Sequence, residues 1–289
     1  MANIKDLKKK IKSTKSTLKT TSAMKLVSAA KLAKAQDRIL NLRPYANELE
    51  TVVKTVSALT SNYRNEYLME KESKQSLLLV ISSDKGLCGG YNSGLAKAVR
   101  SFFKENDPKD FKLLFIGKKT RDLLKSEFNA GKTYTFEKAE PTFDETRKLA
   151  GELADQFKMG EVGRIFIAYN SFNSVISFTP TVKQVLPMGL AENDIENLKQ
   201  AFPFDFKYEP SPESIMDTLV PEVYINTIYT GLLDAIAAEH GSRMSAMENA
   251  TKNCKEMIRE LTIRMNKLRQ AAITTELIEV VSGAESLNA

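Results

Sequence analysis

The sequence is poor in the residues from which metal sites and nucleophilic active sites are commonly built. Its 289 residues include no tryptophan, one histidine and two cysteines, Cys88 and Cys254, which lie far apart in the chain. So few cysteines indicate a reducing compartment and no disulfide framework. One histidine and two distant cysteines also argue against a zinc site, which needs four ligands close together.

Long apolar runs are absent too. No segment approaches the ~20 consecutive apolar residues that a membrane-spanning helix needs. The N-terminal segment MANIKDLKKKIK is basic but lacks the apolar core of a secretory signal. Its amphipathic character leaves a transit peptide open, yet the helical pattern continues through residue 56 and favours a structural element.

Positive charge gathers near the N-terminus. The net charge is +6, and residues 1–40 hold eleven Lys or Arg against two Asp. Such an arm suits nucleic acid, anionic lipid or an acidic protein surface. It equally suits a helix face that is simply solvated, so the charge by itself does not choose a partner.

Residues 3–58 are predicted to form one helix, because they contain no glycine and a single proline. Apolar residues recur in two heptad series, typical of a coiled-coil seam. The series are Ile4, Ile11, Leu18, Lys25, Leu32, Ile39, Ala46, Val53 and Leu7, Thr14, Thr21, Ser28, Ala35, Leu42, Leu49, Val56. The middle of the seam carries Thr14, Thr21, Lys25 and Ser28, where a stable coiled coil has leucine. We interpret this stretch either as loose packing or as a surface that faces water or changing partners.

Residues 76–188 alternate between strand-like and helical patterns. Strands are predicted at 77–81, 112–116, 164–169 and 175–186, and helices near 93–105, 118–128 and 144–158. This alternation predicts a mainly parallel sheet covered by helices on both faces. The turn-rich link at residues 170–174 predicts that the last two strands form an antiparallel hairpin.

Residues 212–283 return to a helical heptad pattern. Its two series are Leu233, His240, Met247, Cys254, Leu261, Leu268 and Ala237, Met244, Thr251, Ile258, Met265, Ala272. The simplest arrangement pairs this helix with the N-terminal one as an antiparallel coiled coil. We expect Pro221 and Gly241 to bend its lower part.

The predicted fold is therefore α/β, with a long antiparallel coiled coil of the terminal helices and a central Rossmann-like domain. The expected divisions are an N-terminal helix over 1–60, the α/β domain over 76–190, a connecting foot over 191–211 and a C-terminal helix over 212–289.

The segment SSDKGLCGGYNSG, residues 82–94, resembles a phosphate-binding turn because it is glycine-rich and links a strand to a helix. However, it lacks both the Gly-Lys-Ser/Thr ending and the G-x-G-x-x-G spacing. We interpret it as a structural turn, with Asn92 or Ser93 capping the next helix, and keep a nucleotide site as the alternative. Cys88 has no candidate base, since His240 lies in the coiled-coil seam. The residues therefore identify no catalytic, cofactor or metal site.

Three separated segments carry a family resemblance: TTSAMKLVSAAKLAKAQDR at 20–38, SSDKGLCGGYN at 82–92 and RQAAITTELIEVVSGAES at 269–286. Together they resemble the gamma subunit of F-type ATP synthase, over essentially the whole chain and in the same helix–domain–helix order. The cysteine-bearing insertion of the chloroplast form is missing. Met1 directly before the first helix favours a bacterial origin.

The resemblance implies a rotor shaft that couples ion-driven rotation of the c-ring to conformational change of the catalytic beta subunits. Implied partners are the alpha and beta subunits, the epsilon subunit and the c-ring, but no nucleic acid. The shaft would be non-catalytic and free of cofactors and metals, and would regulate ATPase activity and ion flow. It would associate with the cytoplasmic face of the bacterial inner membrane only through the complex.

The resemblance also implies residue roles. A catch that binds loops of alpha and beta would use Arg269, Gln270, Thr274, Glu276 and Glu279. Arg269 would offer its planar fork to a carboxylate, and the other side chains would supply polar contacts that can be broken and remade.

Three further contacts are implied. Met24 and Lys25 match the position near the lever of beta, while Tyr208 and Glu209 match the foot that meets the c-ring and epsilon. The residues expected in an apolar bearing near the tip are Ile278, Val280 and Val281.

Two other functions stay open on the residues alone. A nucleic-acid-binding protein would use the basic helix and show salt-dependent affinity, although that helix has a heptad seam and few aromatics. A nucleotide-dependent enzyme would use the turn at 82–94, although no acid, base or metal set accompanies that turn.

Overall fold

A computed structural model of the protein describes residues 4–60, 63–136, 140–189, 192–202 and 206–288. The chain divides into two compact units. A helical unit combines residues 1–28 with 243–289, and an α/β unit comprises residues 29–242. Helix α1 (Ile4–Leu59) and helix α6 (Pro212–Asn288) each contribute to both units. The two long terminal helices predicted from the heptads are thus confirmed.

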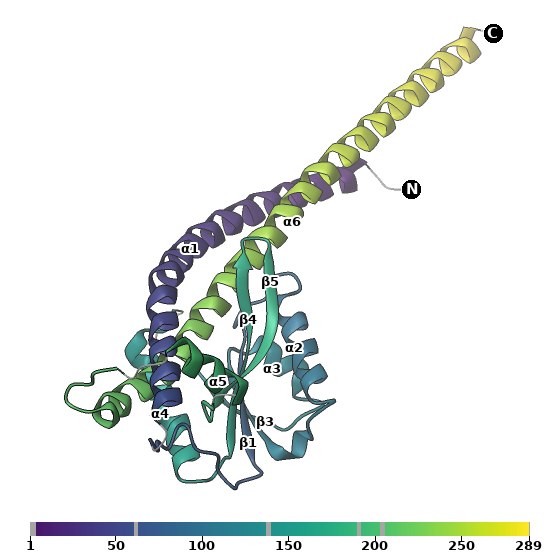
Figure 1. The fold of residues 1–289 in the computed structure, drawn as a ribbon. Helices are drawn as coiled ribbons and strands as arrows, with labels where there is room; N and C mark the ends of the chain where they lie inside the picture. The colour runs from purple at the N-terminus through teal and green to yellow at the C-terminus, as the bar shows by residue number, and fades with distance from the viewer. Residues whose placement is uncertain (1–3, 61–62, 137–139, 190–191, 203–205, 289) are drawn as a thin grey trace. The chain divides into compact units, whose positions relative to one another are not determined.

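The α/β unit is built on a five-stranded sheet with the order β3-β2-β1-β4-β5 (Figure 1). The strands are β1 (Ser76–Ile81), β2 (Phe111–Ile116), β3 (Ala130–Tyr134), β4 (Arg164–Ser174) and β5 (Ser177–Leu186). Strands β1 to β4 pair in parallel, and β4 and β5 form an antiparallel hairpin. The mainly parallel sheet and the terminal hairpin are as the sequence predicts. The position of the turn is wrong, because residues 170–174 pair within β4 and the connection lies at residues 175–176.

Helices cover both faces of this sheet. Helices α2 (Tyr91–Phe102) and α3 (Lys119–Leu124) lie on one face, and α4 (Phe143–Lys158) lies on the other. The unit also contains α5 (Glu192–Ala201) and a short 3-10 turn at Pro108–Asp110. Alternate residues of β1 enter two separate apolar cores. Leu77 and Leu79 pack with α4 and with the parts of α1 and α6 that belong to this unit. Leu78 and Val80 pack with α2 and α3. Burial on both faces explains why β1 is a continuous apolar run.

Two elements of the α/β unit were not predicted from the sequence. Strand β3, with the sequence AGKTY, lies at the sheet edge and is only partly buried, so it lacks an apolar run. Helix α5 lies within the segment that reads as a polar connection. In both cases the local composition is polar enough to resemble a loop.

Helix α6 continues through Pro221 and Gly241 without interruption, from residue 212 to 288, and the bend expected there stays a prediction. Gly241 allows a close approach. A Cβ atom placed on it would lie 2.9 Å from the carbonyl oxygen of Val175 at the β4–β5 turn. Close packing against the hairpin therefore accounts for a glycine at this position.

In the helical unit, α1 and α6 run antiparallel, as predicted. Lys25 Nζ lies 2.7 Å from Glu248 Oε1, and the hydroxyls of Thr21 and Thr251 are 3.0 Å apart. Further along, the hydroxyl of Thr14 contacts a methionine sulfur at residue 257 at 3.8 Å. Residue numbers fall on one helix as they rise on the other.

The polar middle of the α1 seam does not face water. The side chains of Thr14, Thr21 and Ser28 are all buried. Thr14 and Thr21 contact α6 directly, so the suggestion that this stretch is turned toward water or changing partners is wrong for these two side chains. Small polar residues here let two helices pack closely while their hydroxyls find partners.

Candidate functional site

The glycine-rich turn after β1 is filled by its own side chains. The amide of Asn92 accepts a hydrogen bond from the Ser83 backbone N–H at 3.3 Å and donates to Ser83 Oγ at 2.8 Å and to Cys88 Sγ at 3.1 Å. All three residues are buried. The Ser83, Cys88 and Asn92 side chains thus bond to one another and fill the turn, which favours the structural interpretation.

The predicted capping of α2 is wrong. The N-cap residue is Gly90, and no side chain bonds to the first turn from that position. The Asn92 side chain points back to the strand end, while Ser93 Oγ donates to Gly90 O at 3.2 Å. Cys88 is a free thiol that is only 2% exposed. It therefore packs as a small buried side chain in this turn.

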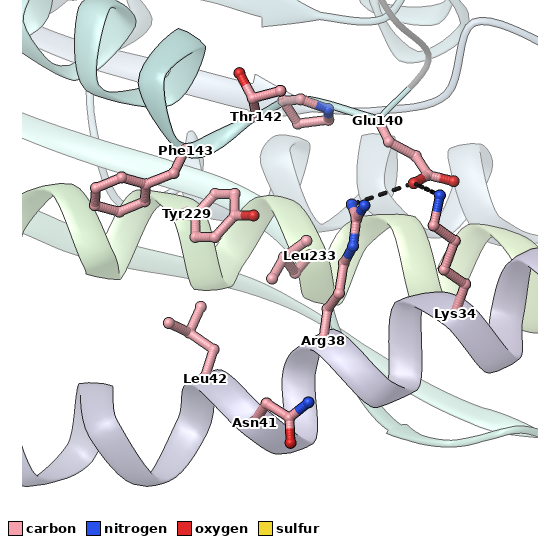
Figure 2. Close-up of a pocket in the computed structure, with 10 residues that line it drawn as sticks. Lys34, Arg38, Asn41, Leu42, Glu140, Thr142, Phe143, Tyr229 and Leu233 are labelled. Carbon is pink, nitrogen blue, oxygen red and sulfur yellow. Dashed lines mark ion pairs between the residues drawn. The ribbon is translucent and has the colours of Figure 1, made fainter.

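The α/β unit also has an open groove of about 810 Å³ between α1, α6 and the start of α4. Figure 2 shows Lys34, Arg38 and Glu140 at one end, where both cations reach one carboxylate oxygen at 3.2 Å. At the other end, the rings of Phe143 and Tyr229 meet edge to face, with centroids 5.3 Å apart. The sequence patterns gave no sign of this groove, because its walls come from three distant segments.

The groove combines surplus positive charge with an aromatic wall. Lys34 and Arg38 share a single carboxylate, and both cations are largely exposed, so this pairing contributes little to stability. A surface of this kind can accept a carboxylate and an apolar group side by side.

An ion pair with a buried carboxylate joins three elements of the α/β unit. Arg43 on α1 donates from Nη2 to Asp234 Oδ1 on α6 at 2.8 Å and to Phe172 O on β4 at 2.9 Å. Asp234 is 4% exposed and also accepts from Ser171 Oγ at 3.4 Å. Burial raises the pKa of the Asp234 carboxyl, and the hydrogen bond from Arg43 opposes this rise.

The residues expected to form a catch all lie exposed on α6 in the helical unit. The helix repeat places Arg269, Glu276 and Glu279 along one stripe and Gln270 and Thr274 along another. Thr274 Oγ1 donates to the Gln270 backbone carbonyl at 3.0 Å. The structure thus presents the five side chains outward, but on two faces of the helix.

Met24 and Lys25, expected near a lever of beta, are half-buried. Lys25 forms the ion pair with Glu248 described above, within the helical unit. Its charge is therefore partly neutralised by α6, whereas the sequence pattern suggests a lysine directed at another chain.

The expected foot residues lie after α5. Glu209 is exposed, and Tyr208 is half-buried against the main core of the α/β unit. Two aromatics accompany Tyr208 that the sequence analysis did not single out. The ring of Phe206 lies 6.4 Å from Tyr208 and 5.6 Å from Phe202, and both phenylalanines are exposed. The sequence AFPFDFKY has an aromatic residue at every second position, and this alternation could have indicated the cluster.

The C-terminal part of α6 is exposed all round. Every side chain from residue 273 to 284 is exposed. The large apolar ones are Ile273, Leu277, Ile278, Val280 and Val281. A continuous apolar surface of this kind marks a contact with another molecule.

The described residues offer no other type of site. Across the ranges given above, no helix has a stretch whose length and apolarity would let it cross a membrane. Within the same ranges, His, Cys, Asp and Glu side chains form no group of three or more that could hold a metal ion.

Comparison with known proteins gives a consistent result along the whole chain. Residues 3–287 match a family model described as ATP synthase. The ATP synthase gamma chain of Anaeromyxobacter sp. is 39% identical over 293 aligned positions, which cover 99% of this chain and all of that protein.

Solved structures are similar as well. A chain from the central stalk and c-ring structure of the Tetrahymena thermophila mitochondrial ATP synthase is 27% identical, with a TM-score of 0.59, covering 80% of this chain and 99% of that one. A chain from the Euglena gracilis mitochondrial ATP synthase is 20% identical, with a TM-score of 0.65, covering 98% and 94%. The second likeness concerns the fold alone.

Proposed function

The chain belongs to the ATP synthase gamma chain family, and from this premise we propose that it is the rotor shaft of an F-type ATP synthase. In this role it couples rotation of an ion-driven c-ring to sequential conformational changes of the catalytic beta subunits. Rotation in one direction drives ATP synthesis, and ATP hydrolysis drives the reverse. The chain itself supplies contacts and makes no covalent bond.

The strongest support for this proposal is the C-terminal part of α6. No other part of the chain that the structure describes packs over this long segment. Residues 273–284 are exposed on every side yet include five large apolar side chains. At 100° per residue these five side chains lie within about 160° of the helix circumference, and so wide an exposed apolar face requires a partner. The opening of an alpha–beta ring would provide one, with the apolar residues as its bearing.

The two stripes of polar residues on α6 suggest how rotation acts on the ring. Arg269 on one stripe offers a bidentate fork to a carboxylate, while Gln270 on the other offers a neutral amide. As the shaft turns, a given beta subunit meets these stripes in succession. Contacts that differ in free energy between conformations of beta shift the population of those conformations.

The remaining partners follow from the family and from the α/β unit. We infer that Tyr208, Glu209 and the neighbouring aromatics contact the c-ring and the epsilon subunit. The exposed lysines of α1, which include Lys5, Lys8 and Lys12, would attract acidic loops of beta by a long-range interaction that tolerates sliding. The chain would reach the cytoplasmic face of a bacterial inner membrane only within the complex, where it also regulates ATPase activity and ion flow.

Reconstitution tests this proposal. The purified chain is mixed with alpha and beta subunits of the same organism, and ATP hydrolysis is measured with and without it. We expect a stable complex whose hydrolysis depends on the chain and falls in Arg269→Ala and Gln270→Ala. Lys267→Ala, an exposed cation in the same turn region but outside the catch, serves as the matched control. Hydrolysis that does not respond to the chain would refute the proposal.

A further inference from the structure

One face of α6 is fastened to the α/β unit by polar contacts that the rotor role alone does not explain. Two of them come from the glycine-rich turn. Tyr91 OH donates to Ala235 O on α6 at 3.0 Å, and Ser242 Oγ on α6 donates to Cys88 O at 2.6 Å. In the turn, Leu87 and Gly89 on either side of Cys88 have φ values of 63° and 54°. This tight turn presents the Cys88 carbonyl to α6.

A third contact comes from the end of β4. The Asp234 carboxylate on α6 accepts hydrogen bonds from the Phe172 backbone N–H and from Ser171 Oγ. Arg43 bridges the same carboxylate to the Phe172 carbonyl. The helix is therefore bonded both to the glycine-rich turn and to the end of strand β4.

These contacts share one narrow stripe of α6. Successive α-helical residues are rotated by about 100°, so the stripe covers roughly a third of the helix circumference. Its members are Gly231, Asp234, Ala235, Ala238, Gly241 and Ser242. The residues are small apart from Asp234, and a Cβ at Gly231 would lie 3.2 Å from Ile167 Cδ1 on β4. The backbone of α6 thus lies close against the sheet.

Apolar packing by itself would leave the position of α6 weakly specified. The hydrophobic effect is not directional, and along this stripe the small side chains interlock little with the sheet, although large side chains such as Ile228 and Leu232 are buried elsewhere on α6. Hydrogen bonds of 2.6–3.0 Å tolerate no such movement. A shift by one helical turn, about 5.4 Å, would break every one of them.

We propose that Tyr91, Asp234 and Ser242 form a joint that sets the rotational and axial position of α6 on the α/β unit. The inference rests on the rotor function proposed above. Torque that enters through the α/β unit must pass into α6, and the same helix continues through residues 243–288. The three side chains are positioning residues, because they hold the helix and do not touch ATP or the catalytic subunits. The glycine-rich turn thereby gains a mechanical role in place of a phosphate-binding one.

The test compares two double variants, each of which loses one tyrosine hydroxyl and one serine hydroxyl. The joint variant Tyr91→Phe/Ser242→Ala removes one tyrosine and one serine hydroxyl that bond across to or from α6. The control variant Tyr134→Phe/Ser73→Ala removes a tyrosine hydroxyl bonded to Glu152 and a serine hydroxyl bonded to Glu161 O, with no bond to α6. Both variants preserve the apolar volume of the side chains.

Hydrogen exchange on the isolated chain is the first readout. In the joint variant, amides of residues 83–94 and 170–177 should exchange roughly ten- to thirty-fold faster, as expected from losing one buried and one part-buried hydrogen bond. In the control variant those amides should keep the wild-type rate. An equal rate in the joint variant and the wild type would overturn the joint.

Single-molecule rotation is the second readout. A bead is attached through Met159→Cys, a site on the α/β unit that is 76% exposed, in a Cys254→Ser background assembled with alpha and beta. At each catalytic pause, the bead on the joint variant should show a wider angular spread than wild type and control, with hydrolysis preserved. Faster exchange with an unchanged spread would mean a purely structural contact and would overturn the positioning role.

The two readouts separate this inference from the rotor function. If wild-type beads do not turn, the rotor function fails and the mechanical role of the joint fails with it. The exchange result on the isolated chain would still show whether Tyr91 and Ser242 hold α6 in place. Turning wild-type beads combined with identical spreads in all variants would refute the joint alone.

Discussion

Replacing Gly241 by alanine has two opposing effects on stability, one from helix propensity and one from packing. Alanine is more favourable than glycine inside a helix by about 1 kcal/mol, so propensity predicts a more stable protein. The new Cβ, however, would lie 2.9 Å from Val175 O and 3.8 Å from Phe172 Cε2. A backbone oxygen has no rotamer that relieves the overlap, and overpacking of this kind costs about 1–3 kcal/mol. We expect Gly241→Ala to lower the free energy of unfolding, by up to about 2 kcal/mol net.

Urea unfolding of the isolated chain, followed by circular dichroism, measures this effect. Gly151→Ala on α4 is the matched control, because a Cβ there would meet nothing within 4 Å. That control should raise the free energy of unfolding by about 0.5–1 kcal/mol. Gly231→Ala, which faces the movable end of an isoleucine at 3.2 Å, should lie between the two. A Gly241→Ala protein as stable as the Gly151→Ala protein would refute the close packing of α6 on the hairpin.

Three further predictions concern charged and polar side chains. Burial raises the folded-state pKa of Asp234 above its ordinary value of 3.8, so its contribution to stability is fully present below that pH and is lost as pH rises through the folded pKa. Asp234→Asn should therefore flatten the loss of stability as pH rises above about 4. Urea melts over a pH series that show the same pH dependence of stability in both proteins would contradict this. Lys25→Ala breaks the exposed pair with Glu248 and should change the free energy of unfolding by less than about 1 kcal/mol, with a larger loss arguing for a buried role. Arg269→Ala and Gln270→Ala are exposed and should leave melting of the isolated chain within about 0.5 kcal/mol of wild type, while reducing ATP hydrolysis by the assembled complex; a fall in stability of the isolated chain would point to a structural role.

Patterns that repeat along the sequence predicted the fold well. The heptad series placed α1 and α6 and their antiparallel pairing, which the contacts from Lys25 to Glu248 and from Thr21 to Thr251 bear out. The apolar run of β1 and its neighbours predicted the parallel sheet. These signals are reliable because burial on a defined face leaves a period in the sequence.

Features that depend on close contact between distant segments were not predictable. Gly241 suggested a bend, and its close approach to the hairpin at Val175 could not be read from the sequence. Strand β3 was missed, since a half-buried edge strand needs few apolar residues. The groove between Lys34, Arg38 and Glu140 also depends on tertiary structure.

The candidate site residues came from sequence motifs, and their contacts with other subunits stay predictions. The structure does describe how exposed these side chains are within this chain. The catch residues around Arg269 face outward, while Lys25 is engaged with Glu248. Motifs identify residue types and order, but the partner of each side chain depends on the neighbouring helix, which a motif does not contain.

Direct observation of rotation tests the central claim most directly. Alpha and beta subunits are fixed to a surface, this chain is assembled into them, and a bead on its α/β unit is followed while ATP is added. A rotor shaft predicts unidirectional stepping of the bead that stops when ATP is withdrawn. A bead that only fluctuates about one angle, in a complex that hydrolyses ATP at the same rate without this chain, would contradict the rotor function.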